Sequence, residues 1–326
     1  MDDVTLLQIE PTTRCNFTCG FCVGRHMHQI DMPSTTVQRA FGLFDRLQAV
    51  EIQGEGEPLL SKDFFAIADE AAGRGAKLSL ITNGSLMSAA NIRRILERPF
   101  EKIAFSLESP EGIAFAKFRG GSLKKVIDGI RRLKEARDAL KKELPMIGLA
   151  VTVLKSTVGQ LEDIVSLYRA LELDGGISFQ GLQRMTGYAE HYPAATAGEM
   201  LTEPELRKLS EFLNRFYADQ SLNRRGAQIG FYPRLFAGLR QRPQVCPWLT
   251  SATYISAEGE VMPCCHIKDT QWSFGNVVSS APADLAKARK TMANCQATGA
   301  TPTPCAGCWV MAILRVTKAG QAGAPM

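Results

Sequence analysis

The stretch VTLLQIEPTTRCNFTCGFC (residues 4–22) joins a β-rich run to a loop that holds three cysteines. The run is dominated by Val, Leu and Ile with little strict alternation, which is expected of a strand covered on both faces. Cys15, Cys19 and Cys22 then follow with the spacing C-x3-C-x2-C. Three thiols at this spacing need an explanation, because a disulfide uses two of them and a structural zinc site uses four ligands.

The same order of β-rich run, turn and helical stretch recurs along the first 185 residues. Further β-rich runs lie at 49–57, 77–84, 102–109, 147–154 and 176–183. Between them, apolar residues recur at three- and four-residue intervals at 37–47, 62–75, 89–97, 122–142 and 158–173. Six strand–helix units predict a parallel α/β sheet. Because a closed barrel has eight units, we expect an open, partial (β/α)6 barrel of the TIM type.

The loops after these β-rich runs carry the polar and glycine residues of this region. EPTTRC, GEGEP, TNG, SLES and QGLQR all stand where a run ends. In parallel α/β folds the functional residues gather at the C-terminal ends of the strands. We therefore expect these loops to form one site.

The sequence changes character at about residue 235. The segment CPWLTSATYISAEGEVMPCCHIKDT (246–270) predicts a β-hairpin with AEGE as its turn, and a helix follows at 281–295. This region holds six of the nine cysteines but too few apolar residues to fold without a metal. We predict a barrel at 1–235, a metal-binding module at 236–318 and a disordered tail at 319–326.

Composition excludes several classes of protein. The chain has 326 residues, a formal charge of +5 and 22% charged residues, and its most basic stretch, RRLKEARDALKK (131–142), is typical of a solvated helix face rather than of a nucleic-acid site. No apolar run reaches the length of a membrane span, and the N-terminus lacks a signal peptide. We expect a cytoplasmic protein, with no membrane or nucleic-acid partner, whose cysteines bind metal rather than form disulfides.

Two kinds of metal site are open to the first cysteine cluster. His26 or His28 could complete a zinc site as the fourth ligand. Three thiolates alone instead suit a [4Fe–4S] cluster with one iron left open for a substrate or cofactor. The ring of Phe21, just before the last cysteine, would shield one side of such a cluster.

This loop resembles the signature of the radical S-adenosylmethionine (SAM) enzymes, which is C-x3-C-x-aromatic-C after the first strand of a partial barrel. The resemblance covers roughly residues 4–185. It implies that the amino and carboxylate groups of SAM chelate the open iron, and that one electron from the cluster cleaves SAM to a 5′-deoxyadenosyl radical. That radical abstracts a substrate hydrogen.

The resemblance extends to the residues expected to bind SAM. Gly56, Glu57 and Pro58 match the last three residues of the family's Gly-Gly-Glu-Pro loop, whereas Glu55 replaces its first glycine. The loop is implied to bind the SAM amino group, since carbonyls and a carboxylate suit an ammonium. The other implied SAM-binding residues are Asn83, Ser106, Glu108 and Arg119. Ordinary turn and helix-cap chemistry is the alternative for each of these positions.

The C-terminal cysteines resemble the shortened SPASM module, often called the twitch domain, of radical SAM enzymes. The resemblance implies one auxiliary [4Fe–4S] cluster, so that the chain holds two clusters, with the second bound by Cys246, Cys264, Cys305 and Cys308. Four thiolates would saturate it, so we expect it to move electrons rather than to bind substrate. A four-cysteine zinc ribbon is the alternative.

Several reactive side chains have no place in these two clusters. Cys265 directly follows a ligand, so in an extended strand its side chain points to the other face. It could donate hydrogen to a substrate radical or be a buried small residue, and Cys295 could be a donor, an alternative ligand or a filler. Arg184, Glu190 and His191 are candidate substrate bases, and His266 is a candidate proton acceptor.

These observations predict a radical SAM oxidoreductase or epimerase. We expect it to dehydrogenate or epimerise a small polar natural product of the aminoglycoside or cyclitol type, and to take electrons from a flavodoxin or ferredoxin. The chain begins almost directly with its first strand, which leaves no room there for a leader-peptide-binding domain and favours a small molecule. A peptide-modifying radical SAM enzyme is the alternative. A non-catalytic zinc-ribbon binding protein is a more remote one.

Overall fold

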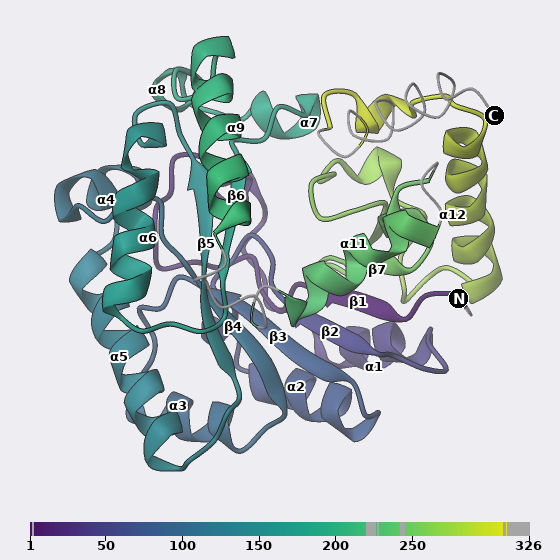
Figure 1. Ribbon diagram of the computed structural model, residues 1–326. Helices are drawn as coiled ribbons and strands as arrows, with labels where there is room; N and C mark the ends of the chain where they lie inside the picture. The colour runs from purple at the N-terminus through teal and green to yellow at the C-terminus, as the bar shows by residue number, and fades with distance from the viewer. Residues whose placement is uncertain (2, 220–225, 227, 242–244, 309–310, 312–326) are drawn as a thin grey trace, which may run out of the picture.

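The computed structural model describes residues 1, 3–219, 226, 228–241, 245–308 and 311, and these residues form an open sheet with helices packed against it (Figure 1). The sheet has eight strands in the order β6-β5-β4-β3-β2-β1-β7-β8. The strands are β1 (Leu6–Ile9), β2 (Ala49–Ile52), β3 (Lys77–Thr82), β4 (Phe100–Ser106), β5 (Met146–Val153), β6 (Ile177–Gly181), β7 (Ala252–Ile255) and β8 (Val261–Met262). Neighbours from β6 to β7 are parallel, and β7 and β8 are antiparallel.

Helices connect the parallel strands as the sequence predicts. They are α1 (Ser34–Gly42), α2 (Phe64–Gly73), α3 (Ala89–Leu96), α4 (Gly112–Arg119), α5 (Leu123–Ala139) and α6 (Leu161–Ala170). The six predicted strand–helix units and the open barrel are confirmed. Helix α4 was not expected, and neither were α7 (Thr186–Ala189), α8 (Ala194–Ala197), α9 (Glu203–Ala218) and α11 (Phe231–Gln241).

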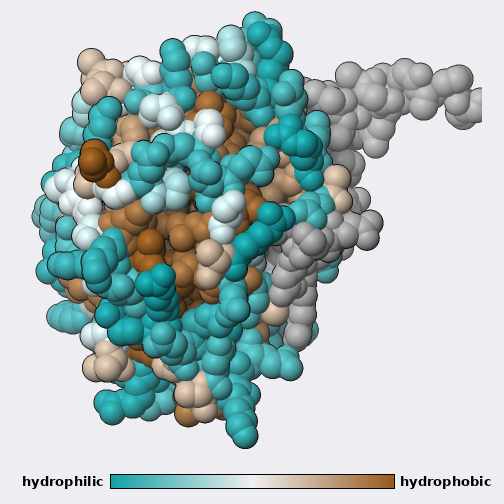
Figure 2. Space-filling view, turned by 60° about the vertical axis from the view of Figure 1, so that its left-hand side comes forward, coloured by the Kyte–Doolittle hydropathy of each residue, from teal (hydrophilic) through white to brown (hydrophobic). Residues whose placement is uncertain are grey.

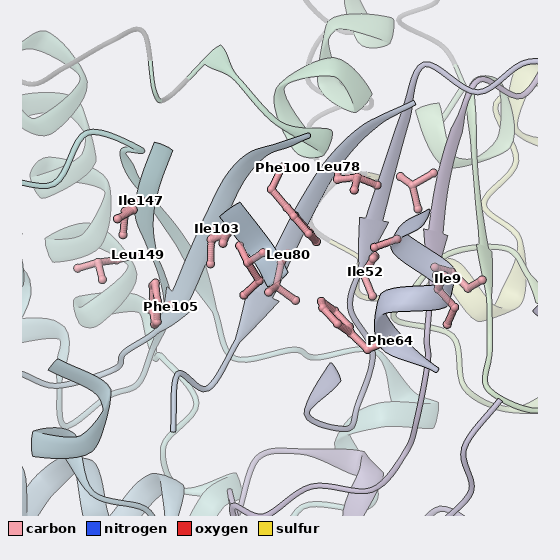
Figure 3. Packing of buried hydrophobic residues seen from close by; sticks show 14 of the residues in the cluster. Ile9, Ile52, Phe64, Leu78, Leu80, Phe100, Ile103, Phe105, Ile147 and Leu149 are labelled. Atoms are coloured by element: carbon pink, nitrogen blue, oxygen red, sulfur yellow. The ribbon is translucent and has the colours of Figure 1, made fainter. Parts of the chain in front are cut away.

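One face of the sheet packs against these helices. Because side chains alternate along a strand, every second residue points to this face. Figure 3 shows Ile52 and Leu80 nearest to Phe64 of α2, with Ile9 and Ile103 on the neighbouring strands to either side. All of these side chains are buried, and they belong to the largest apolar cluster of the molecule. Their removal from water supplies the main favourable free energy of folding.

The opposite face of the sheet carries a row of polar residues. Gln8, Glu51, Ser79 and Lys102 pair in register across β1, β2, β3 and β4. Within the described residues, Glu51 Oε1 and Ser79 Oγ are buried without a hydrogen-bond partner. Burial raises the pKa of Glu51 to about 8, although Lys102 opposes the shift, and burial lowers the pKa of Lys102 to about 8 against the opposing effect of Glu51. Polar groups in such a position are costly unless they are paired.

The C-terminal region joins the same sheet. The predicted hairpin is formed by β7 and β8, and β7 pairs in parallel with β1 from Leu6↔Ala252 to Ile9↔Ile255. The predicted helix is α12 (Pro282–Ala297). The boundary that we predicted at residues 235–236 lies within α11, whose Phe231 packs with Leu6 of β1. We therefore propose that barrel and module share one core, and the predicted tail 319–326 lies outside the described residues.

The surface carries both polar and apolar areas. Figure 2 shows one face on which apolar residues gather at the centre and lie deeper than the hydrophilic residues around them. Among the residues that the structure describes, no helix is both long and apolar enough to span a bilayer.

We predict that Glu51 makes stability depend on pH. The folded chain holds the Glu51 proton up to a pH of about 8, whereas the unfolded chain loses it near the ordinary glutamate pKa of 4.5. Between these values unfolding releases a proton, so stability falls as pH rises. Between roughly pH 5.5 and 8 we expect the unfolding free energy of the wild type to fall by on the order of 2 kcal/mol relative to that of Glu51→Gln.

Urea unfolding of the anaerobic holoprotein across this pH range measures the difference. Glu135→Gln on the exposed side of α5 is the matched control, and it should follow the wild type. Parallel pH profiles of the wild type and Glu51→Gln would contradict the prediction.

Candidate active site

The loop after β1 holds the three N-terminal cysteines in a fixed arrangement. Cys19 is buried, and Cys15 and Cys22 are half-buried. The backbone N–H of Phe17 donates to Cys15 Sγ at 3.4 Å, and the N–H of Cys22 donates to the carbonyl of Cys19 at 3.2 Å. The N–H of Thr18 donates to the carbonyl of Arg119 at 3.0 Å, which ties the loop to the end of α4. The three thiols are therefore positioned by backbone contacts.

The chemistry of these thiols suits a positively charged metal group. Burial raises the pKa of Cys19 to about 11 and also raises the pKa values of Cys15 and Cys22. Thiolates in such a place require a cation nearby. Three sulfur donors on one loop match the ligand set expected of a [4Fe–4S] cluster.

The GEGEP loop lies directly against the cysteine loop. A Cβ on Gly56 would lie 2.3 Å from the carbonyl oxygen of Thr12, so only glycine permits this approach. The N–H of Glu57 donates to the carbonyl of Arg14 at 2.9 Å. The loop then turns into a short 3-10 helix, Pro58–Leu60, so Pro58 stands at its first position.

Glu57 is buried, and its carboxylate joins the loops after β2 and β3. Oε1 accepts from Thr82 Oγ1 at 2.7 Å, and Oε2 accepts from the N–H of Asn83 at 2.7 Å. Asn83 Nδ2 in turn donates to Asn16 Oδ1 at 2.9 Å and lies 3.9 Å from Cys15 Sγ. The predicted SAM-binding residues Gly56, Glu57 and Asn83 are thus brought together beside Cys15, and their role toward SAM stays a prediction.

The remaining predicted SAM-binding residues are Ser106, Glu108 and Arg119, and the carbonyl of Arg119 lies 3.7 Å from Cys19 Sγ. Glu108 and Arg119 form a buried ion pair, with Arg119 Nη2 2.7 Å from Glu108 Oε1. Burial favours the neutral form of Arg119, but Glu108 outweighs it and raises the pKa of the guanidinium. The guanidinium lies 5.6 Å from the centre of the Phe21 ring. Ser106 is half-buried at the end of β4.

The sequence did not identify two residues that reach the same place. Tyr188 of α7 donates to Glu55 Oε2 at 3.0 Å, and Lys268 Nζ lies 3.0 Å from Glu55 Oε1. Although burial favours the protonated acid, Lys268 and the hydrogen bonds from Cys22 and Tyr188 lower the pKa of Glu55. Glu55 is the sequence signal that points to such residues, because an acidic side chain buried in a loop requires a cation or a hydrogen-bond donor as its partner.

The four predicted ligands of the auxiliary cluster are also gathered in one place. Cys246, Cys264, Cys305 and Cys308 belong to one apolar cluster between the hairpin, α11 and the C-terminal turn. Gln296 of α12 accepts from the N–H of Cys246 at 2.8 Å, and its Nε2 lies 3.7 Å from Cys305 Sγ. Burial raises the pKa values of Cys246, Cys264 and Cys305. As in the first site, the donor set fits an iron–sulfur cluster.

The two remaining cysteines differ in position. Cys265 is buried, hydrogen-bonds with Tyr232 of α11 and lies near Lys268. The expectation of an extended strand is wrong here, because Cys265 lies in a turn after β8 and in the same apolar cluster as Cys246 and Cys305. Cys295 is exposed on α12. His266 is half-buried, and desolvation lowers its pKa to about 4.

The candidate bases lie near the surface. Glu190 and His191 are exposed, and the His191 ring stacks on His26 with centroids 5.5 Å apart. The Arg184 guanidinium donates to the carbonyl of Leu201. His28, the other candidate zinc ligand, lies 3.4 Å from Glu258.

Comparisons with known proteins agree with this arrangement. The radical SAM superfamily model matches residues 9–167, and the model of the SPASM iron–sulfur cluster-binding domain matches residues 246–309. The tungsten-containing aldehyde ferredoxin oxidoreductase cofactor-modifying protein of Pyrococcus furiosus is 24% identical over 299 residues, which cover 86% of this chain and 80% of that protein.

Solved structures share the fold. SuiB of Streptococcus suis bound to its precursor peptide SuiA superposes with a TM-score of 0.66 at 17% identity, covering 97% of this chain and 73% of that one. The anSMEcpe protein with bound AdoMet gives a TM-score of 0.66 at 16% identity, covering 90% and 84%.

The fold and the two thiol sites define an iron–sulfur enzyme built on a partial barrel. The chain belongs to the radical SAM superfamily and carries a SPASM-type module. Its cofactors are SAM and a [4Fe–4S] cluster in the barrel, and the SPASM-type module implies additional iron–sulfur content.

We predict that each set of cysteines holds its own cluster. Anaerobically reconstituted wild type should contain about eight irons per chain, and the variant with Cys15, Cys19 and Cys22 changed to Ala should contain about four. Cys305→Ala/Cys308→Ala should also contain about four. Iron and acid-labile sulfide assays measure this, and a fall from about four to none in the first variant would show that the module holds no cluster.

We also predict that removing one member of the Glu108–Arg119 pair destabilises the fold more than removing the charges of both. Arg119→Met leaves a buried carboxylate uncompensated and should cost about 3–5 kcal/mol of unfolding free energy. The double variant Glu108→Gln/Arg119→Met should lose less than Arg119→Met alone, because no charge is left unpaired. Urea unfolding measures the cycle, and additive losses would contradict it.

Proposed function

We propose that this enzyme removes a hydrogen atom from a small polar substrate and returns one to the opposite face, and is thus an epimerase. The observation that carries the proposal is the position of Cys265, a buried thiol beside Tyr232 and Lys268. The other outcome expected from the sequence, dehydrogenation, needs a base at the substrate. The candidate bases Glu190 and His191 are exposed to solvent, which favours epimerisation in this proposal.

A polar substrate is supported by the lining of the barrel. In the row Gln8, Glu51, Ser79 and Lys102, Lys102 Nζ donates to the carbonyl of Gly226 at 3.0 Å. Glu51 Oε1 and Ser79 Oγ are buried without a hydrogen-bond partner among the described residues. The Tyr232 hydroxyl lies 3.0 Å from Gln53 Oε1, between this row and Cys265. Hydroxyl and amino groups would satisfy such acceptors, as an aminocyclitol or aminoglycoside would.

In the proposed reaction, the cofactors remove hydrogen from the substrate and Cys265 returns it. When bound, SAM and the first cluster supply a 5′-deoxyadenosyl radical that removes hydrogen from the substrate. Cys265 then gives the hydrogen atom of its S–H bond to the substrate carbon, so that a C–H bond forms and a thiyl radical remains on sulfur. One electron from a flavodoxin- or ferredoxin-type donor and one proton restore the thiol.

A peptide substrate is the second candidate. It is supported by the structural neighbours, since the SuiB structure holds the precursor peptide SuiA and an anSMEcpe structure holds the Kp18Cys peptide. Those likenesses concern the fold, so the lining of the barrel ranks a small polar molecule first.

We predict that turnover in D₂O labels the product through Cys265. The holoenzyme would be incubated with SAM, dithionite and a panel of aminocyclitols and aminoglycosides, and products analysed by mass spectrometry. The inverted product should carry one deuterium, because the thiol exchanges with solvent. Cys265→Ala should still form 5′-deoxyadenosine but no inverted product, whereas Cys295→Ala, the matched control, should behave as wild type.

Other outcomes overturn specific parts of the proposal. A product two hydrogens lighter than the substrate, still made by Cys265→Ala, would establish dehydrogenation. Deuterium uptake only with peptides would overturn the substrate class.

A further inference from the structure

A buried ion pair touches one ligand of the first cluster. Lys268 Nζ lies 3.0 Å from Glu55 Oε1, and the two side chains are only 6% and 9% exposed. The other carboxylate oxygen, Oε2, lies 3.2 Å from Cys22 Sγ. Glu55 belongs to the loop after β2 and Lys268 to the segment after β8, so the pair joins the barrel to the C-terminal module.

Close packing holds Glu55 against the cysteine loop. A Cβ on Gly24 would lie 2.6 Å from Glu55 Cβ, so glycine is what lets the two loops meet. The N–H of Glu55 donates to Glu10 Oε1 at 2.6 Å. These contacts fix the backbone and Cβ of Glu55, and its carboxylate is held beside Cys22 by Tyr188 and Lys268.

Lys268 is equally constrained. Its Nζ lies 3.0 Å from the Tyr254 hydroxyl and 4.4 Å from the centre of the Tyr254 ring. Tyr254 lies in β7, which pairs with β1, so the lysine is positioned by the sheet that also carries the cysteine loop. Its charge stays next to Glu55.

Fixed charges beside a cluster alter its affinity for an electron. The potential of an iron–sulfur cluster depends on net charge, on hydrogen bonds to its sulfurs and on solvent exposure. A carboxylate near a ligand sulfur disfavours reduction, and a lysine at the same distance favours it. Once Cys22 gives up its proton to bind iron, it no longer donates to Glu55. Among the described residues, Lys268 and Tyr188 still contact the carboxylate and offset its charge.

We propose that the Glu55–Lys268 pair sets the reduction potential of the cluster held by Cys15, Cys19 and Cys22. Glu55 makes the cluster harder to reduce, and Lys268, a positioning residue from the module, limits this effect. The inference rests on Cys22 being a cluster ligand, but not on the identity of the substrate. It also explains why an acid is tolerated at a position where the family pattern has glycine.

The test is a redox titration of the holoenzyme followed by electron paramagnetic resonance. Glu55→Gln should raise the midpoint potential of the first cluster, and Lys268→Met should lower it. The double variant should return toward the wild-type value, and Lys268→Arg should stay near it because the charge is kept. Asp69→Asn, which breaks the Arg98–Asp69 pair on the helical side, should leave the potential unchanged.

Several results would contradict the proposal. Glu55→Gln and Lys268→Met shifting the potential in the same direction, or not at all, would show that the pair is only structural. Where Lys268→Met loses iron, the sign of the Glu55→Gln shift decides. A wild-type signal that survives replacement of Cys15, Cys19 and Cys22 by Ala would instead overturn the ligand assignment.

Discussion

The double pairing of β1 is the constraint on which both metal sites depend. Gln8 of this strand pairs with Glu51 on one side and with Tyr254 on the other, so β1 lies between the barrel and the C-terminal module. Its loop must therefore emerge between the GEGEP loop and the segment after β7. Glu10, at the end of β1, accepts from the N–H groups of Glu55 and Ala257 and fixes both neighbours. The distance between the two thiol sites follows from one short strand.

Two buried ion pairs lie next to the loop that holds the first three cysteines. Glu108 with Arg119, and Glu55 with Lys268, are ion pairs that hydrophobic residues of similar size could replace without loss of stability. Both pairs adjoin the cysteine loop, Glu55 at Cys22 and Arg119 at Cys19. Since such pairs are weak contributors to folding, their position is better explained by the chemistry of the cluster than by stability. Glu51 Oε1, which is buried without a hydrogen-bond partner among the described residues, supports the same functional explanation for the polar row that we propose contacts the substrate.

Local patterns predicted most of the architecture. The strands are predicted because runs such as 147–154 are apolar and bounded by turns. The hairpin is predicted because AEGE is a turn sequence, and in the structure its Gly259 has a φ of 89°. Cysteine spacing predicted both thiol sites. Helix α4 was missed because its eight residues are too few for a clear apolar period, and α11 because no apolar period was recognised between the barrel and the hairpin.

Long-range side-chain contacts were beyond such patterns. Tyr188 lies 133 positions from Glu55, and Lys268 lies farther still in sequence. A single lysine or tyrosine on a loop carries no periodic signal, and its partner is set by how the sheet brings loops together. The sequence did indicate that Glu55 departs from the family pattern. It did not indicate what compensates the charge.

The loop after β6 completes the enclosure of the first site. Tyr188 and Tyr192 lie with Phe21 of the cysteine motif in a separate apolar cluster, and their rings meet edge to face with centroids 5.9 Å apart. The same loop places His191 on His26. Water exclusion protects reactive intermediates from side reactions, and a radical has to be kept from all hydrogen donors except the intended one. Because Tyr188 also holds Glu55, the residue that closes the site on this side also fixes the charge beside Cys22. Closure and cluster electrostatics therefore depend on the same contact.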